Sequence, residues 1–198
     1  MNNKVQNVLL GVLAIGLIGI TVAYAALTQQ LKIEGTAKVA SSKWDVHFGT
    51  VSAGNAQGYA TAGTLAKTGE TTIAGDIGTL KAPGDSITYT FDIENAGDIN
   101  AIIDTVTGGQ SFTCTSATKS VADAVCKDLT YSIKYTDGNA TIAKGDKLAK
   151  ATSASAPTKK NVTLTITYNK TDAQQTLASE DVTVTADPMT ITYVQDAK

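Results

Sequence analysis

Apolar and polar residues alternate along much of the chain. Three long runs, residues 87–93, 129–135 and 162–168, carry an apolar side chain at every second position. A period of two places those side chains on one face of a β-strand, so each run predicts a half-buried strand. Shorter apolar runs predict further strands at residues 31–33, 44–48, 77–80, 99–106, 182–184 and 191–194.

Turn-forming residues separate the predicted strands, as in Pro83-Gly84-Asp85, Asn95-Ala96-Gly97-Asp98 and Asp137-Gly138-Asn139. About eight or nine strands result, and because no long amphipathic helix lies between them, antiparallel pairing is expected. Half-buried strands cover their apolar faces by packing one sheet on another. The pattern therefore predicts an all-β fold, an antiparallel β-sandwich of jelly-roll or immunoglobulin-like type, in preference to a barrel.

Three segments interrupt the alternation. Residues 111–127 are expected to hold a short helical turn at 121–125, and residues 149–160 have the composition of a polar connector. Residues 49–70 are rich in Gly, Ala and Thr, which is typical of a long loop or a loosely held hairpin. The strands together are enough for one domain, predicted over residues 26–198.

The N-terminal segment is apolar and carries no charge between Lys4 and Lys32. Such a stretch can enter or span a bilayer. It ends in Ala23-Tyr24-Ala25, the small-x-small arrangement of a signal peptidase site, and cleavage after Ala25 would leave Ala26 as the first residue. Residues 1–25 are therefore interpreted as a signal peptide, with membrane contact only through residues 5–27 before cleavage. The alternative is a retained helix, either a membrane anchor or a pilin-type assembly helix.

The segment behind this site, residues 26–40, has an alternating pattern of its own. Its apolar face would consist of Leu27, Leu31, Ile33, Ala37 and Val39. We expect a strand here, either the first strand of its own domain or a donor strand that joins an open sheet edge on a second copy. A head-to-tail contact that does not close into a ring propagates into a filament.

Composition argues against several classes of function. The 16 basic residues are all Lys, the net charge is −2, and the absence of Arg makes nucleic-acid binding unexpected. The only His, His47, cannot supply the two His of a zinc protease motif. On its predicted strand, His47 is expected to face solvent, and Trp44 to anchor the core. No catalytic residue, metal ligand or cofactor is predicted, and the chain is interpreted as a non-enzyme.

The two cysteines, Cys114 and Cys126, are separated by eleven residues. In a chain expected to reach an oxidising compartment, this spacing favours a disulfide that closes a small loop. A metal or redox pair is disfavoured because the spacing is not CxxC and the chain has no second pair of cysteines.

Three asparagines, Asn139, Asn161 and Asn169, match the glycosylation sequon N-x-Thr. Such matches arise by chance in a Thr-rich chain and would gain meaning in an archaeal protein. There, a retained apolar helix in front of a Thr-rich β-domain would resemble an archaeal pilin. No prepilin-type cleavage site precedes the apolar run.

The first half of the chain resembles a known family. A leader ending in AYA, the strand LKIEGTAKV, the Trp-centred strand SSKWDVHF and the segment GTLKAPGDSITYTFDIENAGDINAII are similar to the TasA and camelysin-like secreted proteins of Gram-positive bacteria. The resemblance is weak after Thr107. It implies a jelly-roll protein built into extracellular biofilm fibres, in which the N-terminal segment of one subunit completes a sheet of the next. The proteolytic activity described for the camelysin branch finds no zinc motif here.

Two classes of function remain. The first is a secreted structural subunit of the cell surface or biofilm matrix, whose partners are copies of itself and a signal peptidase. The second is a monomeric secreted or membrane-anchored binding module that uses residues 49–70 or the cysteine loop to hold a ligand.

Overall fold

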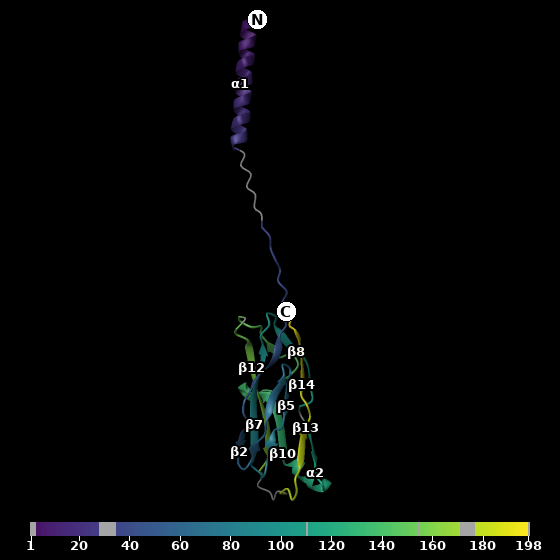
Figure 1. The fold of residues 1–198 in the computed structure, drawn as a ribbon. Helices are drawn as coiled ribbons and strands as arrows, with labels where there is room; N and C mark the ends of the chain where they lie inside the picture. Colours follow the sequence, from purple (N-terminus) through teal and green to yellow (C-terminus); the bar gives the residue numbers. More distant parts are fainter. Residues whose placement is uncertain (1–2, 28–34, 110, 154, 171–176, 198) are drawn as a thin grey trace. The chain divides into compact units, whose positions relative to one another are not determined.

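The computed structural model of the chain describes residues 3–27, 35–109, 111–153, 155–170 and 177–197 (Figure 1). It divides into two compact units, Met1–Ala40 and Ser41–Lys198. The described β-strands lie in the second unit, and the long helix lies in the first.

The first unit contains helix α1 (Asn3–Leu27). Leu and Ala, which favour helix formation, are frequent in this segment. The predicted cleavage residues Ala23, Ala25 and Ala26 lie in its last turns, and Leu27 is its final residue. In the portion of the chain covered by the structure, no helix is both long enough and apolar enough to cross a membrane.

The structure describes only part of the strand that is expected over residues 26–40. Leu31 and Ile33 fall outside the described residues, and Leu27 is helical. Ala37 and Val39 are described, belong to no strand and are exposed, with 94% of Val39 accessible to solvent. Residues 35–40 therefore lie in no strand, and the strand expected around residues 31–33 stays a prediction.

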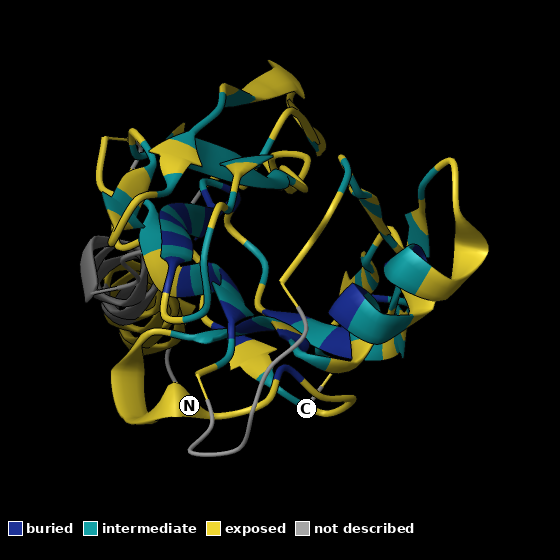
Figure 2. Cartoon of the chain, turned by 90° about the horizontal axis from the view of Figure 1, so that it is seen from below, coloured by how far each residue is buried: buried dark blue, intermediate teal, exposed yellow. Residues whose placement is uncertain are grey.

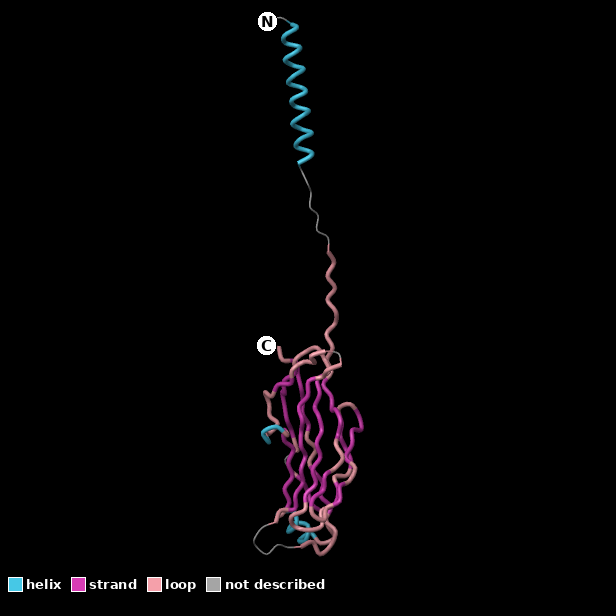
Figure 3. Tube along the Cα trace, turned by 90° about the vertical axis from the view of Figure 1, so that its left-hand side faces the viewer, coloured by secondary structure: helices cyan, strands magenta, loops and turns pink. Residues whose placement is uncertain are grey.

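The larger sheet has five antiparallel strands. Its order is β1 (Val46–Val51), β7 (Ser86–Asn95), β12 (Thr158–Tyr168) and β10 (Leu129–Tyr135). β12 pairs with β7 from Ser86 to Asn95, so β2 (Asn55–Gln57) lies on the same edge of β7 as β1. Figure 3 shows the long strands of the second unit, in magenta, running side by side.

The remaining strands form smaller antiparallel sheets. Three of them lie in the order β11 (Lys147–Leu148), β8 (Ala101–Thr107) and β14 (Thr190–Gln195). Three two-stranded sheets pair β13 (Thr183–Ala186) with β9 (Phe112–Thr115), β3 (Thr61–Ala62) with β6 (Gly78–Thr79), and β4 (Leu65–Gly69) with β5 (Thr72–Gly75). Helix α2 (Lys119–Lys127) and the 3₁₀ turn η1 (Asp137–Asn139) complete the unit.

The prediction of a mainly antiparallel β fold is confirmed. The three long alternating runs lie in β7, β10 and β12, and the helical turn expected at 121–125 lies in α2. Fourteen strands occur among the described residues, more than expected, because several have only two to five residues and are too short to show alternation. The predicted connector 149–160 was wrong at its end, since β12 begins at Thr158.

One hydrophobic core contains side chains from the five-stranded and the three-stranded sheets, which are the two major sheets. Its buried members include Ile87 and Tyr89 of β7, Leu164 of β12, and Ala101 and Ile103 of β8. In Figure 2 the dark blue buried segments lie mainly on strands, and the yellow exposed segments lie mainly at the periphery. Burial of each such aliphatic side chain contributes roughly 1.5–3 kcal/mol, so this shared core is the main stabilising element.

The Pro-Gly-Asp turn before β7 is organised by Asp85. This side chain is 1% exposed, and its carboxylate accepts hydrogen bonds from the backbone N–H groups of Lys81, Tyr59 and Ala82 at 2.7–3.0 Å. Burial alone would raise its pKa, but these N–H donors outweigh burial and hold the pKa below its ordinary value. The turn is thus fixed by a buried, ionised carboxylate.

Candidate functional site

The candidate site lies along β1, the edge strand of the larger sheet. Among the described strands, β1 pairs only with β7, and β14 pairs only with β8. Edge strands carry backbone groups that a further strand can pair with. Two grooves adjoin β1, one toward β14 and one toward β4.

The groove toward β14, which we call the seam groove, is largely apolar. It has a cavity volume of about 160 Å³. Its apolar walls come from the larger sheet and from the segment that includes β14, and consist of Val46, Phe48, Ile93, Met189, Ile191 and Tyr193. Except for Ile93, these residues are only partly buried at the margin of the core. The seam groove is therefore a place where core side chains of two sheets remain partly open.

Phe48 fixes one wall of the seam groove. Its ring meets that of Phe91 edge to face, with centroids 5.7 Å apart. This arrangement suits the aromatic quadrupoles and restrains both rings. The Phe48 N–H donates to the carbonyl of Glu70 at 2.8 Å, which ties the β4–β5 hairpin to β1. The wall is thus held in place from two sides.

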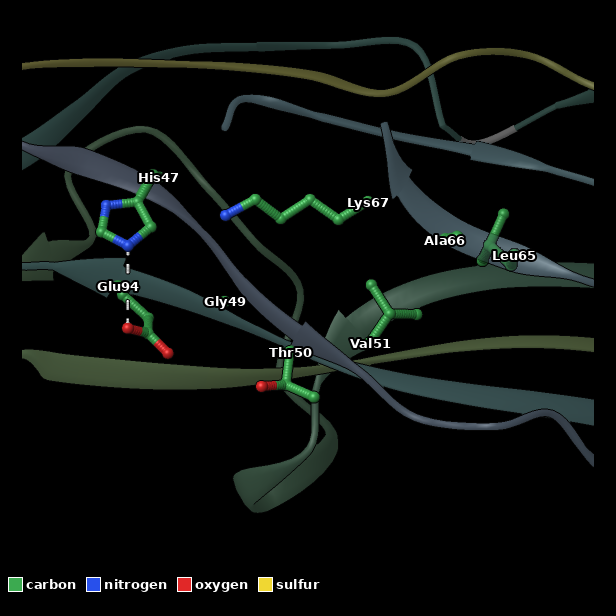
Figure 4. A pocket seen from close by; sticks show the side chains of 8 residues that line it. All are labelled: His47, Gly49, Thr50, Val51, Leu65, Ala66, Lys67 and Glu94. Carbon is green, nitrogen blue, oxygen red and sulfur yellow. Dashed lines mark ion pairs between the residues drawn. The ribbon is translucent and has the colours of Figure 1, made fainter. Parts of the chain in front are cut away.

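The groove toward β4, which we call the outer groove, is larger and more polar. Its cavity volume is about 510 Å³, and its lining includes Val51 and Leu65 beside His47, Lys67 and Glu94. In Figure 4 Lys67 extends from β4 toward His47, and His47 points at Glu94. A cation, an imidazole and a carboxylate therefore face one open space.

A row of charged and polar residues crosses the outward face beside this groove. His47, Glu94 and Lys159 lie opposite one another on β1, β7 and β12. His47 Nε2 is 3.7 Å from Glu94 Oε2, and Lys159 Nζ is 2.7 Å from Glu94 Oε1. The hydrogen bond to Glu94 raises the pKa of Lys159. Glu94 thus links three strands through its two oxygens.

Asp45 and Gly49 support this row. Asp45 Oδ1 lies 2.7 Å from His47 Nδ1, and the hydrogen bond from Lys43 lowers the pKa of Asp45. The strand register shifts between Phe48 and Val51, and a Cβ at Gly49 would collide with the Glu94 carboxylate. A glycine at this bulge therefore lets Glu94 lie across β1.

Two predictions about this region were wrong. His47 does not simply face solvent, because its side chain is only 19% exposed between Asp45 and Glu94. Trp44 is not a core anchor, because it is 44% exposed and precedes the first residue of β1. The chain joins the sheet only at Val46, so the alternation that placed Trp44 inside does not apply.

The predicted cysteine pair comes together in the structure. Cys114 on β9 and Cys126 on α2 lie at disulfide distance, with their Cα atoms 6.0 Å apart. Cys114 also packs against a small second cluster that contains Val125, Leu129 and Tyr168. This pair lies apart from the two grooves and closes the loop that carries α2.

Sequence reasoning did not identify Glu94, Lys159 or the seam residues as parts of a site. The pairing of His47 with Glu94 depends on strand register, which a single sequence does not encode locally. Met189 and Tyr193 face Phe48 through tertiary packing alone. In the regions that the structure covers, no group of three or more His, Cys, Asp or Glu side chains is arranged to hold a metal ion.

No protein-family model matches the chain, and neither a curated protein nor a solved structure matches it. The resemblance to the TasA and camelysin-like proteins therefore stays a hypothesis that rests on the quoted sequence segments.

Proposed function

We propose that this chain is an exported structural subunit of the cell surface or biofilm matrix, related to the TasA-like proteins, that polymerises with copies of itself. Its two major sheets would form the layers of a β-sandwich of jelly-roll or immunoglobulin-like type. The proposal includes no enzymatic activity and no cofactor. Its partners would be a signal peptidase and further copies of the same chain.

The seam groove is the observation that carries this proposal. It opens between an edge strand of one sheet and an edge strand of another, and its walls are half-buried apolar side chains such as Phe48, Ile191 and Tyr193. An added strand would pair with backbone groups of the β14 edge, which pairs with no described strand besides β8, and would complete the burial of these side chains. The groove thus has the chemistry of an acceptor for an amphipathic strand.

The matching donor would be residues 26–40 of a second copy. The alternating Leu31, Ile33, Ala37 and Val39 would enter the groove, and the polar residues between them would face outward. Fifteen extended residues span about 50 Å, more than the roughly 20 Å of a six-residue strand such as β14. The exposed Val39 supports this assignment, because a β-branched apolar side chain gains from burial.

Cleavage after Ala25 would control assembly. Before cleavage, the apolar residues 5–27 would hold the chain at the membrane. After cleavage, the segment from Ala26 would be free to pair with a neighbour. Because each subunit would offer one donor strand and one acceptor groove, the contact repeats head to tail and generates a filament.

The outer groove favours a second candidate function. Its volume of about 510 Å³ and its lining by His47, Lys67 and Glu94 suit a polar ligand. In this case the chain would be a monomeric binding module, either secreted or held to the membrane by α1. A retained α1 that packs against copies of itself would instead define a pilin-type subunit.

Electron microscopy of protein that begins at Ala26 tests the proposal. Fibres are expected from this protein and should be lost on deletion of residues 26–35. The double variant Leu31→Ser/Ile33→Ser should also form no fibres, while the matched change on the polar face, Gln30→Ser/Lys32→Ser, should retain them. Fibres that persist after the deletion would refute the donor-strand role. A monomer that never polymerises would favour the binding module.

A further inference from the structure

The turn after β10 contains one of the three sequons, Asn139-Ala140-Thr141. It contains η1 and is closed by the Tyr135 N–H, which donates to the Ala140 carbonyl at 2.9 Å, and by a bridge between Lys134 and Thr141. Residues 136–141 are all exposed. The closing contacts involve the backbone of Ala140 and Thr141, and Asn139 lies in the turn directly before them.

The side chain of Asn139 is exposed and sterically open. Its φ of +51° is a conformation that Asn tolerates better than most residues, and a Cβ added at neighbouring Gly138 would meet nothing within 4 Å. Within the described residues, neither the Asn139 amide nor the Thr141 hydroxyl has a hydrogen-bond partner. Both groups of this sequon are therefore available to an enzyme.

The other two sequons are engaged in the fold. Asn161 lies within β12, between β7 and β10, and its amide contacts the carboxylate of Asp92. The hydroxyl of its sequon partner Thr163 is 2.7 Å from that of Thr136. Asn161 is itself exposed, but its amide and the Thr163 hydroxyl are both engaged by other side chains, and its backbone is paired within the larger sheet.

Asn169 is held at the end of the same strand. Its side-chain amide donates to Thr130 Oγ1 at 2.7 Å, and its backbone N–H donates to the carbonyl of Asp128 at 2.7 Å. Its amide nitrogen is thus committed to the fold, unlike that of Asn139.

The three sequons also differ in the charge of the residue two positions before the Asn. Asp137 stands two residues before Asn139, whereas Lys159 and Thr167 stand at the equivalent positions before Asn161 and Asn169. An exposed carboxylate at this distance can pair with a basic side chain in the acceptor pocket of a transferase. Accessibility, free hydrogen-bonding groups and a local anionic charge therefore coincide at Asn139 alone among the three.

We propose that Asn139 accepts an asparagine-linked oligosaccharide from a donor in which the sugar is joined to a polyprenol through a diphosphate. In the reaction, Asn139 Nδ2 forms a bond to C1 of the first sugar. The bond between C1 and the diphosphate oxygen breaks, its electron pair leaves with the polyprenyl diphosphate, and the proton lost from Nδ2 passes to a base of the transferase. Neither an oxidant nor a reductant is required, and the proposal does not depend on self-assembly.

The test uses the purified, folded full chain in detergent. It is incubated with a polyprenyl-diphosphate-linked oligosaccharide and a single-subunit bacterial oligosaccharyltransferase that selects an acidic residue two positions before the Asn. Intact-mass measurement should show one added glycan, and peptide mapping should place it at Asn139. A synthetic peptide of residues 135–143, treated in parallel, confirms that the transferase is active.

Variants test whether glycan transfer depends on the Asn139 sequon and its neighbouring Asp137. Asn139→Asp keeps a residue that tolerates positive φ and should abolish transfer, as should Thr141→Ala, whereas Thr141→Ser should retain it. Asp137→Asn should reduce transfer at least tenfold, and Asn161→Gln and Asn169→Gln should leave it unchanged. Transfer to Asn161 or Asn169 would overturn the proposal. So would an unmodified folded chain beside a fully glycosylated peptide.

Discussion

Glu94 and Lys159 face each other across β7 and β12, with Lys159 Nζ 2.7 Å from Glu94 Oε1. The other Glu94 oxygen faces His47 on β1, so one carboxylate joins the edge strand to the centre of the sheet. If β1 forms a wall of the acceptor groove, this row keeps the wall in register.

Replacing Glu94 with Gln should therefore weaken the attachment of β1. The amide keeps the shape but loses the charge that both Lys159 and His47 face. We expect a lower urea midpoint for Glu94→Gln than for the wild-type chain. Lys67→Gln breaks an ion pair whose Glu70 side chain is 75% exposed, and should change the midpoint less. Equal midpoints for the two variants would contradict the role of Glu94.

The buried carboxylate of Asp85 should make the free energy of unfolding depend on pH in the acid range. Because its folded pKa is lowered, its contribution is complete above the unfolded value of about 4 and is lost as pH falls through the folded pKa. Asp85→Ala would leave three backbone N–H groups without their acceptor, and should cost about 2–4 kcal/mol at neutral pH. Urea titrations between about pH 2 and pH 6 measure both effects. Asp85→Asn serves as control and should flatten the acid dependence.

The disulfide should stabilise the chain mainly through its unfolded state. Closing a loop between residues 12 apart contributes about 3 kcal/mol by restricting the unfolded chain. Urea unfolding with and without a reducing agent measures this difference. The variant Cys114→Ser/Cys126→Ser should match the reduced wild-type chain and should not respond to the reductant. Insensitivity of the wild-type chain to reduction would contradict the pairing.

Ionisation of the half-buried Tyr193 hydroxyl should lower the stability of the fold in alkali. Burial, more than any other influence, raises its pKa to about 12. Burial also raises the pKa of Tyr135, which hydrogen-bonds to Tyr193. The neutral forms are favoured by folding, so this contribution is complete below about pH 10 and is lost as pH rises through about 12. Tyr193→Phe should unfold at higher pH than the wild-type chain, as followed by circular dichroism.

The long strands are predictable because the alternation of apolar and polar residues lies within each strand's own sequence. β7, β10 and β12 are all of this kind. The start of β12 was missed because Lys159, Lys160 and Asn161 are consecutive polar residues, and strand pairing with β7 is what makes them extended. The cysteine pair was predictable from spacing and count alone.

The candidate site was less predictable, since it is made by tertiary contacts. The seam groove forms only where β1 and β14 lie close together in the fold. These two strands are more than a hundred residues apart in the sequence. His47 is half-buried because Glu94 lies opposite it, and Glu94 reaches that position across a bulge at Gly49. Neither the bulge nor the register has a local signal in the chain.

Binding of a free donor peptide tests the central claim most directly. Calorimetry would measure the affinity of a synthetic peptide of residues 26–40 for the subunit that begins at Ser41. We predict binding at one site per subunit, lost with the Leu31→Ser/Ile33→Ser peptide and with the groove variant Ile191→Glu, and kept with the Gln30→Ser/Lys32→Ser peptide. No binding to a folded subunit, or equal binding to Ile191→Glu, would contradict the account.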